Sequence, residues 1–224
     1  MNFKTDDQLE KAKLEDVLVE LLYGKYKELV FHGGTAIWRC YSGNRFSRDI
    51  DFYIGGRTEA GPLLTEISDF LKDKGFALKE RGYDGKTRTM HLLVESTTKM
   101  KIDLNLKPKK GAPVEYTRVD GSKMVVLSLT PEELLEEKIE ACEDKRRGGG
   151  FKQAEVQDFY DIYHLTALCS RKPQTARRLA ALIEEAEKDP PRNVRSLDHL
   201  ILSGAAPSFE FMVKKIKEWA HEAG

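Results

Sequence analysis

The sequence predicts an α+β protein in two parts, a mixed and mostly antiparallel sheet with helices in residues 1–128 and a helical region in residues 129–224. Three observations support this division. Residues 76–127 contain several short apolar runs separated by turn residues, which is typical of strands in a sheet. A glycine pair at 33–34 joins an apolar run to a helical pattern. Beyond Ser128, almost every segment shows the apolar spacing of a helix.

The first predicted elements surround the glycine pair. Residues 7–22 carry leucine and valine at helical spacing, which predicts an amphipathic helix packed behind the first strand. That strand ends at Phe31, the glycines turn the chain, and a short helix is expected from Thr35. A second strand follows, and it carries Asp49 and Asp51. This stretch is the centre of the functional interpretation.

The remaining elements of the first part are a helix, three strands and a hairpin. The helix is expected over residues 63–74 and ends at Gly75, whose freedom at positive φ suits a helix end. Strands are expected over residues 76–80, 87–95 and 100–106, with turns at 82–86 and 96–99. Runs 114–119 and 124–127 bracket an Asp120-Gly121 turn and predict a hairpin.

The second part begins with a helix-start pattern. Thr130 is a suitable N-cap, proline follows at the first helical position, and Glu133 stands three residues after the cap. Helices are expected over residues 134–146, 153–168, 175–188, 194–202 and 208–223, with a flexible glycine tract at 148–150.

The pair Asp49 and Asp51 indicates a cation site. Successive strand residues point to opposite faces, so these two carboxylates project the same way while Ile50 between them faces a core. Like charges so close are unfavourable unless a cation lies between them, and hard oxygen ligands suit Mg²⁺. Upstream, Gly33 and Gly34 leave backbone N–H groups uncovered at a helix start, which predicts a phosphate cradle.

The stretch GGTAIWRCYSGNRFSRDIDFYI resembles the first motif of the AbiEii/AbiGii toxin family, a branch of the DNA polymerase β-like nucleotidyltransferases. The general form is Gly-Gly-Thr/Ser, a spacer, and Asp-x-Asp, and Thr35 stands where the wider superfamily often carries serine. The resemblance implies a polymerase β-like lobe followed by a helical lobe. It also implies nucleotide binding by Gly33, Gly34, Thr35, Arg45 and Ser47.

A third carboxylate is expected in the strand KIDLNL. Alternation places Lys101, Asp103 and Asn105 on one face, and taken alone Asp103 is a solvated side chain. The resemblance assigns Asp103 to the site, because polymerase β-like enzymes take a third carboxylate from a strand beside Asp-x-Asp. Three carboxylates then hold two Mg²⁺ ions roughly 4 Å apart, with Mn²⁺ as an alternative.

The helical part contains a second group of charged residues. Lys138 lies in VLSLTPEELLEEKIEA, and Asp158 and Asp161 lie three apart in VQDFYDIYHL, so the two aspartates share a helix face. Alone, these are solvated charges. Both stretches resemble AbiEii motifs, which implies that Lys138 binds nucleotide phosphates and that Asp158 or Asp161 completes the catalytic site. Gln157 stands where family members usually carry arginine.

Composition excludes several other classes. The 37 basic and 37 acidic residues give a formal net charge of zero, which argues against non-specific coating of nucleic acid. The 3 cysteines are far apart, so neither a disulfide framework nor a zinc site is indicated. The histidines are scattered, and we expect them to be structural. Without a membrane span or signal peptide in the sequence, we expect a cytoplasmic protein.

The expected reaction is transfer of a nucleoside monophosphate from an NTP to an acceptor hydroxyl. The resemblance further implies the toxin of a toxin–antitoxin pair, with an antitoxin as partner and the 3′ end of tRNA as a plausible acceptor. Three alternatives stay open at this point. They are a small-molecule nucleotidyltransferase of the antibiotic-modifying type, a kinase-like phosphotransferase, and a non-catalytic nucleotide-binding regulator.

Overall fold

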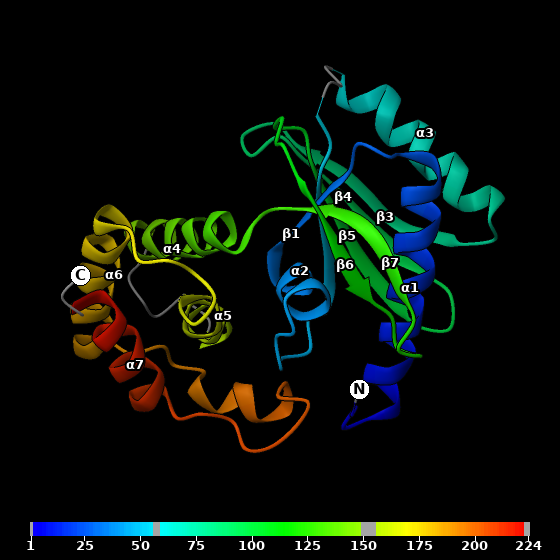
Figure 1. Ribbon diagram of the computed structural model, residues 1–224. Coiled ribbons are helices and arrows are strands. Elements are labelled where there is room, and N and C mark those ends of the chain that lie inside the picture. The colour runs from blue at the N-terminus through cyan, green and yellow to red at the C-terminus, as the bar shows by residue number, and fades with distance from the viewer. Residues whose placement is uncertain (1, 56–58, 149–155, 222–224) are drawn as a thin grey trace. The chain divides into compact units, whose positions relative to one another are not determined.

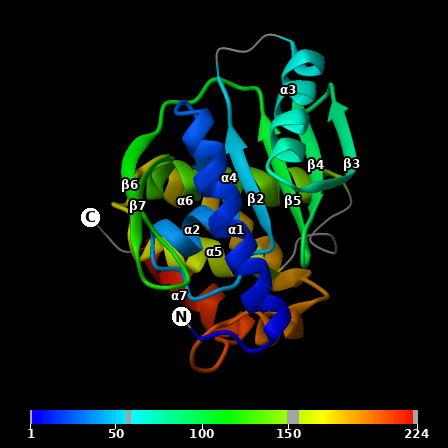
Figure 2. The same cartoon turned by 90° about the vertical axis from the view of Figure 1, so that its right-hand side faces the viewer.

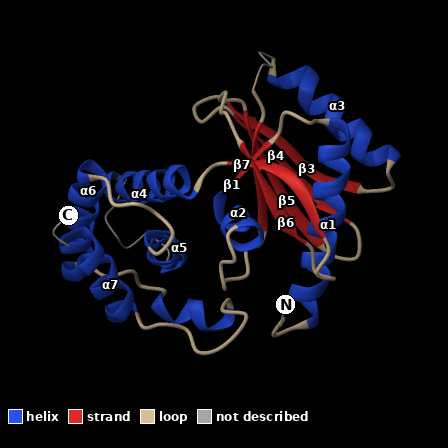
Figure 3. Cartoon of the chain, in the orientation of Figure 1, coloured by secondary structure: helices blue, strands red, loops and turns tan. Residues whose placement is uncertain are grey.

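The computed structural model describes residues 2–55, 59–148 and 156–221. Contacts divide the chain into two compact units. The first comprises Met1–Ser42 and Phe46–Leu129, and the second comprises Gly43–Arg45 and Thr130–Gly224. Strands are confined to the first unit, and the second is built from helices (Figures 1 and 3).

The first unit contains a seven-stranded sheet in the order β3-β4-β5-β2-β1-β7-β6. Pairs β1·β2, β3·β4, β4·β5 and β6·β7 are antiparallel, whereas β1·β7 and β2·β5 are parallel. This confirms the predicted mixed, mostly antiparallel sheet. The strands are β1 (Val30–His32), β2 (Asp49–Tyr53), β3 (Ala77–Asp84), β4 (Thr89–Glu95), β5 (Lys99–Asn105), β6 (Ala112–Thr117) and β7 (Lys123–Ser128).

Strand β3 is longer than its sequence pattern predicts. A turn is expected at residues 82–86, but β3 continues to Asp84 and Gly82 pairs with His91 of β4. The pairing shifts between Leu78 and Glu80, which is a β-bulge or a similar irregularity. Pairing to β4 therefore overrides the turn preference of Gly82, because the ladder supplies backbone hydrogen bonds that a turn would forgo.

Three helices complete the first unit: α1 (Asp6–Lys25), α2 (Gly33–Cys40) and α3 (Ala60–Asp73). Helices α1 and α3 lie on one face of the sheet (Figure 2). The apolar residues of the alternating strands are buried against them, and the ring of Tyr23 in α1 contacts that of Phe52 in β2 at 5.6 Å. Ile50, Ile102 and Leu104 share this buried face. The residues between them, including both aspartates of β2, consequently project from the other face.

A buried ionic cluster joins helix α2 to helix α1 and strand β6. Arg39 of α2 donates from Nε to Glu15 Oε1 at 2.8 Å and from Nη2 to Asp16 Oδ1 at 2.5 Å. The hydroxyl of Tyr116 lies 2.9 Å from Glu15 Oε1 and from Asp16 Oδ1. Glu15 is fully buried, and its second oxygen, Oε2, has no hydrogen-bond partner. An unpartnered buried carboxylate oxygen is costly when charged, so this cluster favours a protonated Glu15.

The second unit contains α4 (Pro131–Arg147), α5 (Val156–Thr166), α6 (Pro173–Lys188), the 3₁₀ helix η2 (Val194–His199) and α7 (Phe209–His221). The predicted capping box is confirmed: Thr130 and Glu133 exchange side-chain-to-backbone hydrogen bonds at the start of α4. Parts of three predicted segments lie outside the described residues: 149–150 of the glycine tract, 153–155 of the helix expected over 153–168, and 222–223 of the last helix. None of the helices in the described ranges is long and apolar enough to cross a membrane.

Candidate active site

The register of strand β2 gathers four polar residues on one row of the sheet. Asp51 pairs with His32 of β1 and with Asp103 of β5, and Asp103 pairs in turn with His91 of β4. Residues in register on neighbouring strands project from the same face, about 4.8 Å apart along the hydrogen-bonding direction. Asp49 precedes Asp51 by two residues and shares that face. The three predicted carboxylates are therefore neighbours on the backbone of one sheet face.

The glycine turn fits directly against Asp51. Gly33 has φ +70, and a Cβ placed there would lie 2.2 Å from Asp51 Oδ2. No other residue fits without moving that carboxylate, so close approach and backbone conformation both require glycine. Helix α2 begins at this residue, and the first N–H groups of a helix have no intrahelical acceptor and carry partial positive charge. The turn therefore suits phosphate oxygens beside a carboxylate-bound cation.

The hydroxyl of Thr35 has a structural partner. Thr35 is fully buried, and its Oγ1 donates to the backbone carbonyl of Asp49 at 2.6 Å. This bond fastens the first turn of α2 to the start of β2. The Thr35 hydroxyl is thus committed to Asp49, and the phosphate contact predicted for Thr35 stays a prediction. Ser47, also predicted for the cradle, is buried in the segment just before β2.

The third carboxylate is held by two cationic or hydrogen-bonding neighbours. Asp103 Oδ1 lies 2.8 Å from His91 Nδ1, and Oδ2 accepts from Lys101 Nζ at 2.6 Å. Burial lowers the pKa of Lys101, but its hydrogen bond to Asp103 and the charges of the three aspartates raise the pKa overall. Within the described residues, no three His, Cys, Asp or Glu side chains stand together closely enough to hold a metal ion.

The donor set nevertheless fits a hard divalent cation. Three carboxylates on one sheet face supply the oxygen ligands that Mg²⁺ and Mn²⁺ take. Asp51 already lies against the glycine turn, where substrate phosphates would complete the coordination shell. The backbone register therefore sets three carboxylates on one sheet face, and Asp103 would have to leave its present partners to act as a cation ligand.

The second unit holds the other predicted group as a buried ionic network. Lys138 Nζ lies 3.0 Å from Asp158 Oδ1 and 2.8 Å from Asp161 Oδ2. Arg45 binds Asp161 with two parallel hydrogen bonds of 2.9 Å and 2.7 Å, and Lys145 Nζ lies 2.6 Å from Asp158 Oδ2. Burial raises the pKa of Asp158, but its two lysine partners outweigh burial and lower it. Three cations thus surround two carboxylates.

Arg45 is placed differently from its sequence neighbours. It belongs with residues Gly43–Arg45 to the helical unit, and only 5% of its side chain is exposed. Besides Asp161, its Nη1 donates to Gln157 Oε1 at 3.2 Å. Gln157 therefore accepts a bond that an arginine at this position could not. The structure brings the predicted residues together in two groups, with Arg45, Lys138, Asp158 and Asp161 in the helical unit and the others in the sheet unit.

Sequence reasoning did not single out Lys101 and His91. The pattern KIDLNL did place Lys101 on the same face as Asp103. From the sequence, His91 is expected to be structural. In the hairpin formed by β4 and β5, however, the short turn fixes the register, and this register sets His91 opposite Asp103. Assigning that hairpin register from the sequence would have found the contact.

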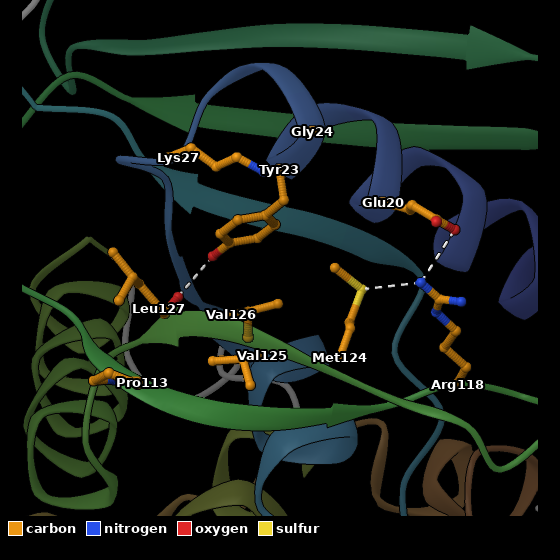
Figure 4. Close-up of a pocket in the computed structure, with 10 residues that line it drawn as sticks. All are labelled: Glu20, Tyr23, Gly24, Lys27, Pro113, Arg118, Met124, Val125, Val126 and Leu127. Atoms are coloured by element: carbon orange, nitrogen blue, oxygen red, sulfur yellow. Dashed lines mark hydrogen bonds and ion pairs between the residues drawn. The ribbon is translucent and has the colours of Figure 1, made fainter.

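A separate pocket of about 410 Å³ lies in the sheet unit between α1 and the β6–β7 hairpin (Figure 4). Tyr23 lines it from α1, Lys27 lines it from the segment that follows α1, and Val125 lines it from β7. Arg118 Nη2 lies 3.1 Å from Glu20 Oε2 at its edge. None of the candidate site residues lines this pocket.

A family model described as nucleotidyl transferase AbiEii toxin, type IV toxin–antitoxin system, matches residues 16–223. The chain belongs to the AbiEii family. This confirms the resemblance seen in its motifs, and the AbiEii-family chain is a nucleotidyltransferase that uses an NTP as substrate. Family membership also implies an antitoxin partner. No curated protein sequence matches the chain significantly.

Solved structures agree on the fold. The crystal structure of JHP933 from Helicobacter pylori superposes with a TM-score of 0.66 at 18% sequence identity, covering 96% of this chain and 91% of that one. Another H. pylori structure, of a proposed nucleotidyltransferase, gives 0.66 at 20% identity, covering 96% of this chain and 94% of that one. At such identities the similarity shows the shared fold of this AbiEii-family chain, and its site must be argued from its own residues.

Proposed function

We propose that this AbiEii-family enzyme transfers a nucleoside monophosphate from an NTP to an acceptor hydroxyl in a reaction that depends on Mg²⁺, with Mn²⁺ as an alternative. One observation carries this proposal. The parallel register of β2 and β5 sets Asp51 opposite Asp103, while the glycine turn at Gly33 closes on Asp51. Carboxylates beside helix N–H groups that have no intrahelical acceptor are the arrangement that binds a cation and the phosphates it accompanies.

In the sheet unit, Asp49, Asp51 and Asp103 would hold the divalent cations. Bound there, two such ions would activate the attacking oxygen and neutralise the departing pyrophosphate. The backbone contributes as well: the N–H groups of the first turn of α2 would receive phosphate oxygens. Thr35 keeps that turn in register with Asp49 through its bond to the carbonyl. Nucleotidyl transfer needs little beyond such positioning and charge neutralisation.

In the helical unit, we assign Lys138 to the triphosphate. The network of three cations and two carboxylates carries one positive charge in excess, which favours an anionic ligand. Asp158 and Asp161 would orient the lysine ammonium, because both accept from it at 3.0 Å or less. Arg45 would act through Asp161, which it holds by a two-point hydrogen bond.

We propose the 3′ end of tRNA as the acceptor and a toxin role as the biological context. The family belongs to type IV toxin–antitoxin systems, which supports the toxin role. A terminal ribose hydroxyl offers the oxygen nucleophile that the reaction needs. The formal net charge of zero fits a protein that docks one RNA end rather than one that coats RNA along its length.

The test is to incubate the purified chain with Mg²⁺, each α-labelled NTP in turn and total tRNA. Asp51→Asn removes one carboxylate charge at nearly constant shape, and Asp69→Asn makes the same change at an exposed position on α3. We expect label on tRNA with the unaltered chain and with Asp69→Asn, and none with Asp51→Asn. Release of pyrophosphate without labelling of tRNA would indicate that the acceptor is a small molecule and not tRNA. Equal transfer by Asp51→Asn would refute the proposed site.

A further inference from the structure

The third carboxylate, Asp103, is bound by side chains of its own strand and of the neighbouring strand. Both oxygens of Asp103 are engaged within strands β4 and β5, one with His91 Nδ1 at 2.8 Å and the other with Lys101 Nζ at 2.6 Å. Asp51, in contrast, lies against the glycine turn, where Oδ2 is 2.2 Å from the position that a Cβ on Gly33 would take. The carboxylates are equivalent in sequence pattern but not in their surroundings.

Lys101 is placed to interact with the whole carboxylate group. It is in register with Asp49 across the parallel β2·β5 pair, and it is two residues before Asp103 on the same face of β5. Its side chain is 45% exposed, so the ammonium can move into solvent on its flexible four-carbon stem. The ammonium therefore binds Asp103 directly, on the sheet face that also carries Asp49 and Asp51.

We propose that Lys101 is an internal counter-cation of the site, and that a divalent ion using Asp103 must displace its ammonium. This inference rests on the proposed metal set of Asp49, Asp51 and Asp103. An ion held by Asp49 and Asp51 alone leaves the Lys101 contact intact. An ion that recruits Asp103 competes with Lys101 and with His91. The site consequently takes up divalent ions in two classes of unequal affinity, and Lys101 sets the difference between them.

The test is a titration of the full chain with Mn²⁺ in the absence of nucleotide. The electron paramagnetic resonance signal of the free ion measures the affinities of both classes of bound divalent ion. Lys101→Met keeps the length of the side chain and removes the charge. We expect it to tighten the weaker class by about 3- to 10-fold, because a partly exposed ion pair and one nearby positive charge are lost. Lys101→Arg, which keeps the charge, should leave the affinity close to that of the unaltered chain.

Lys99→Met is the matched control. Lys99 lies on the same strand and the same face, is 59% exposed, and pairs with Glu95 instead of the aspartates. Its replacement removes the same charge and should change Mn²⁺ affinity by less than about twofold, because an exposed charge farther from the aspartates is largely screened. An equal gain in Lys99→Met and Lys101→Met would show a general charge effect and overturn the role of Lys101.

Asp103→Asn separates this inference from the proposed function. We expect it to abolish the weaker class in both the unaltered and the Lys101→Met backgrounds. If Asp103→Asn abolishes that class but Lys101→Met leaves it unchanged or weaker, the metal set stands and the counter-cation role is refuted. If Asp103→Asn leaves Mn²⁺ binding unchanged, the proposed metal set itself is wrong.

Discussion

Replacing Glu15 by glutamine should make the stability of the protein less dependent on pH. Burial raises the pKa of Glu15 from 4.5 to about 7, against the opposing charge and hydrogen bond of Arg39. Between these pH values the folded protein keeps a proton on Glu15 that the unfolded chain has released. The stabilisation linked to this proton is complete below the unfolded pKa and is lost as pH rises through the folded one.

The magnitude follows from the size of that shift. Each pKa unit corresponds to about 1.4 kcal/mol, so the free energy of unfolding should fall by about 3 kcal/mol between pH 4.5 and pH 8 on account of Glu15 alone. Asp16 also has a raised pKa, caused first by burial, and it adds a loss of the same sign at lower pH. Glu15→Gln resembles the protonated side chain and removes the Glu15 contribution.

Urea unfolding followed by circular dichroism at pH 5 and pH 8 measures the effect. We expect the stability of Glu15→Gln relative to the unaltered chain to be about 3 kcal/mol more favourable at pH 8 than at pH 5. Glu10→Gln, at an exposed position of the same helix, should show no such difference. Parallel pH dependences for Glu15→Gln and the unaltered chain would refute a protonated Glu15 in the folded state.

Three further changes test the site and its supports. Gly33→Ala should lower kcat/KM at least about tenfold, because a Cβ would displace the Asp51 carboxylate; unchanged steady-state kinetics would contradict this. Arg45→Met should destabilise the helical unit by about 3 kcal/mol, because it removes a buried partner of Asp161. Amide hydrogen exchange in α5 measures this loss of stability, and unchanged protection of those amides would contradict the prediction. Thr35→Val should cost about 1–2 kcal/mol in thermal unfolding, and Thr35→Ser should restore most of that.

Local patterns predicted the elements well where one side of an element is buried. The alternation in β5 follows directly from a strand whose apolar residues Ile102 and Leu104 enter the core. The register across strands was harder to predict, because it depends on which strands become neighbours. Parallel pairing of β2 with β5 joins segments separated by a helix and two strands, and nothing local to either segment specifies it.

Buried charges were the other limit. Glu15 and Arg39 lie on helices whose sequences are compatible with solvated surface positions, since such residues are seldom fully buried. For Arg45 the family resemblance predicts nucleotide binding, whereas its carboxylate partner Asp161, 116 residues away, could not be predicted from the sequence. Long-range contacts of this kind leave no periodic trace in the sequence, because the partners come from segments far apart in the chain.

The assignment of Gly43–Arg45 to the helical unit has a consequence for the order of folding during synthesis. All segments of the sheet unit have been made once residue 129 is complete, so that unit can close first. Asp161 lies 116 residues after Arg45, so roughly 6–23 s pass between the synthesis of these two residues at ordinary rates of translation. A fragment beginning at Thr130 would never meet this guanidinium. The helical unit can therefore be completed only on a chain that already carries the preceding loop.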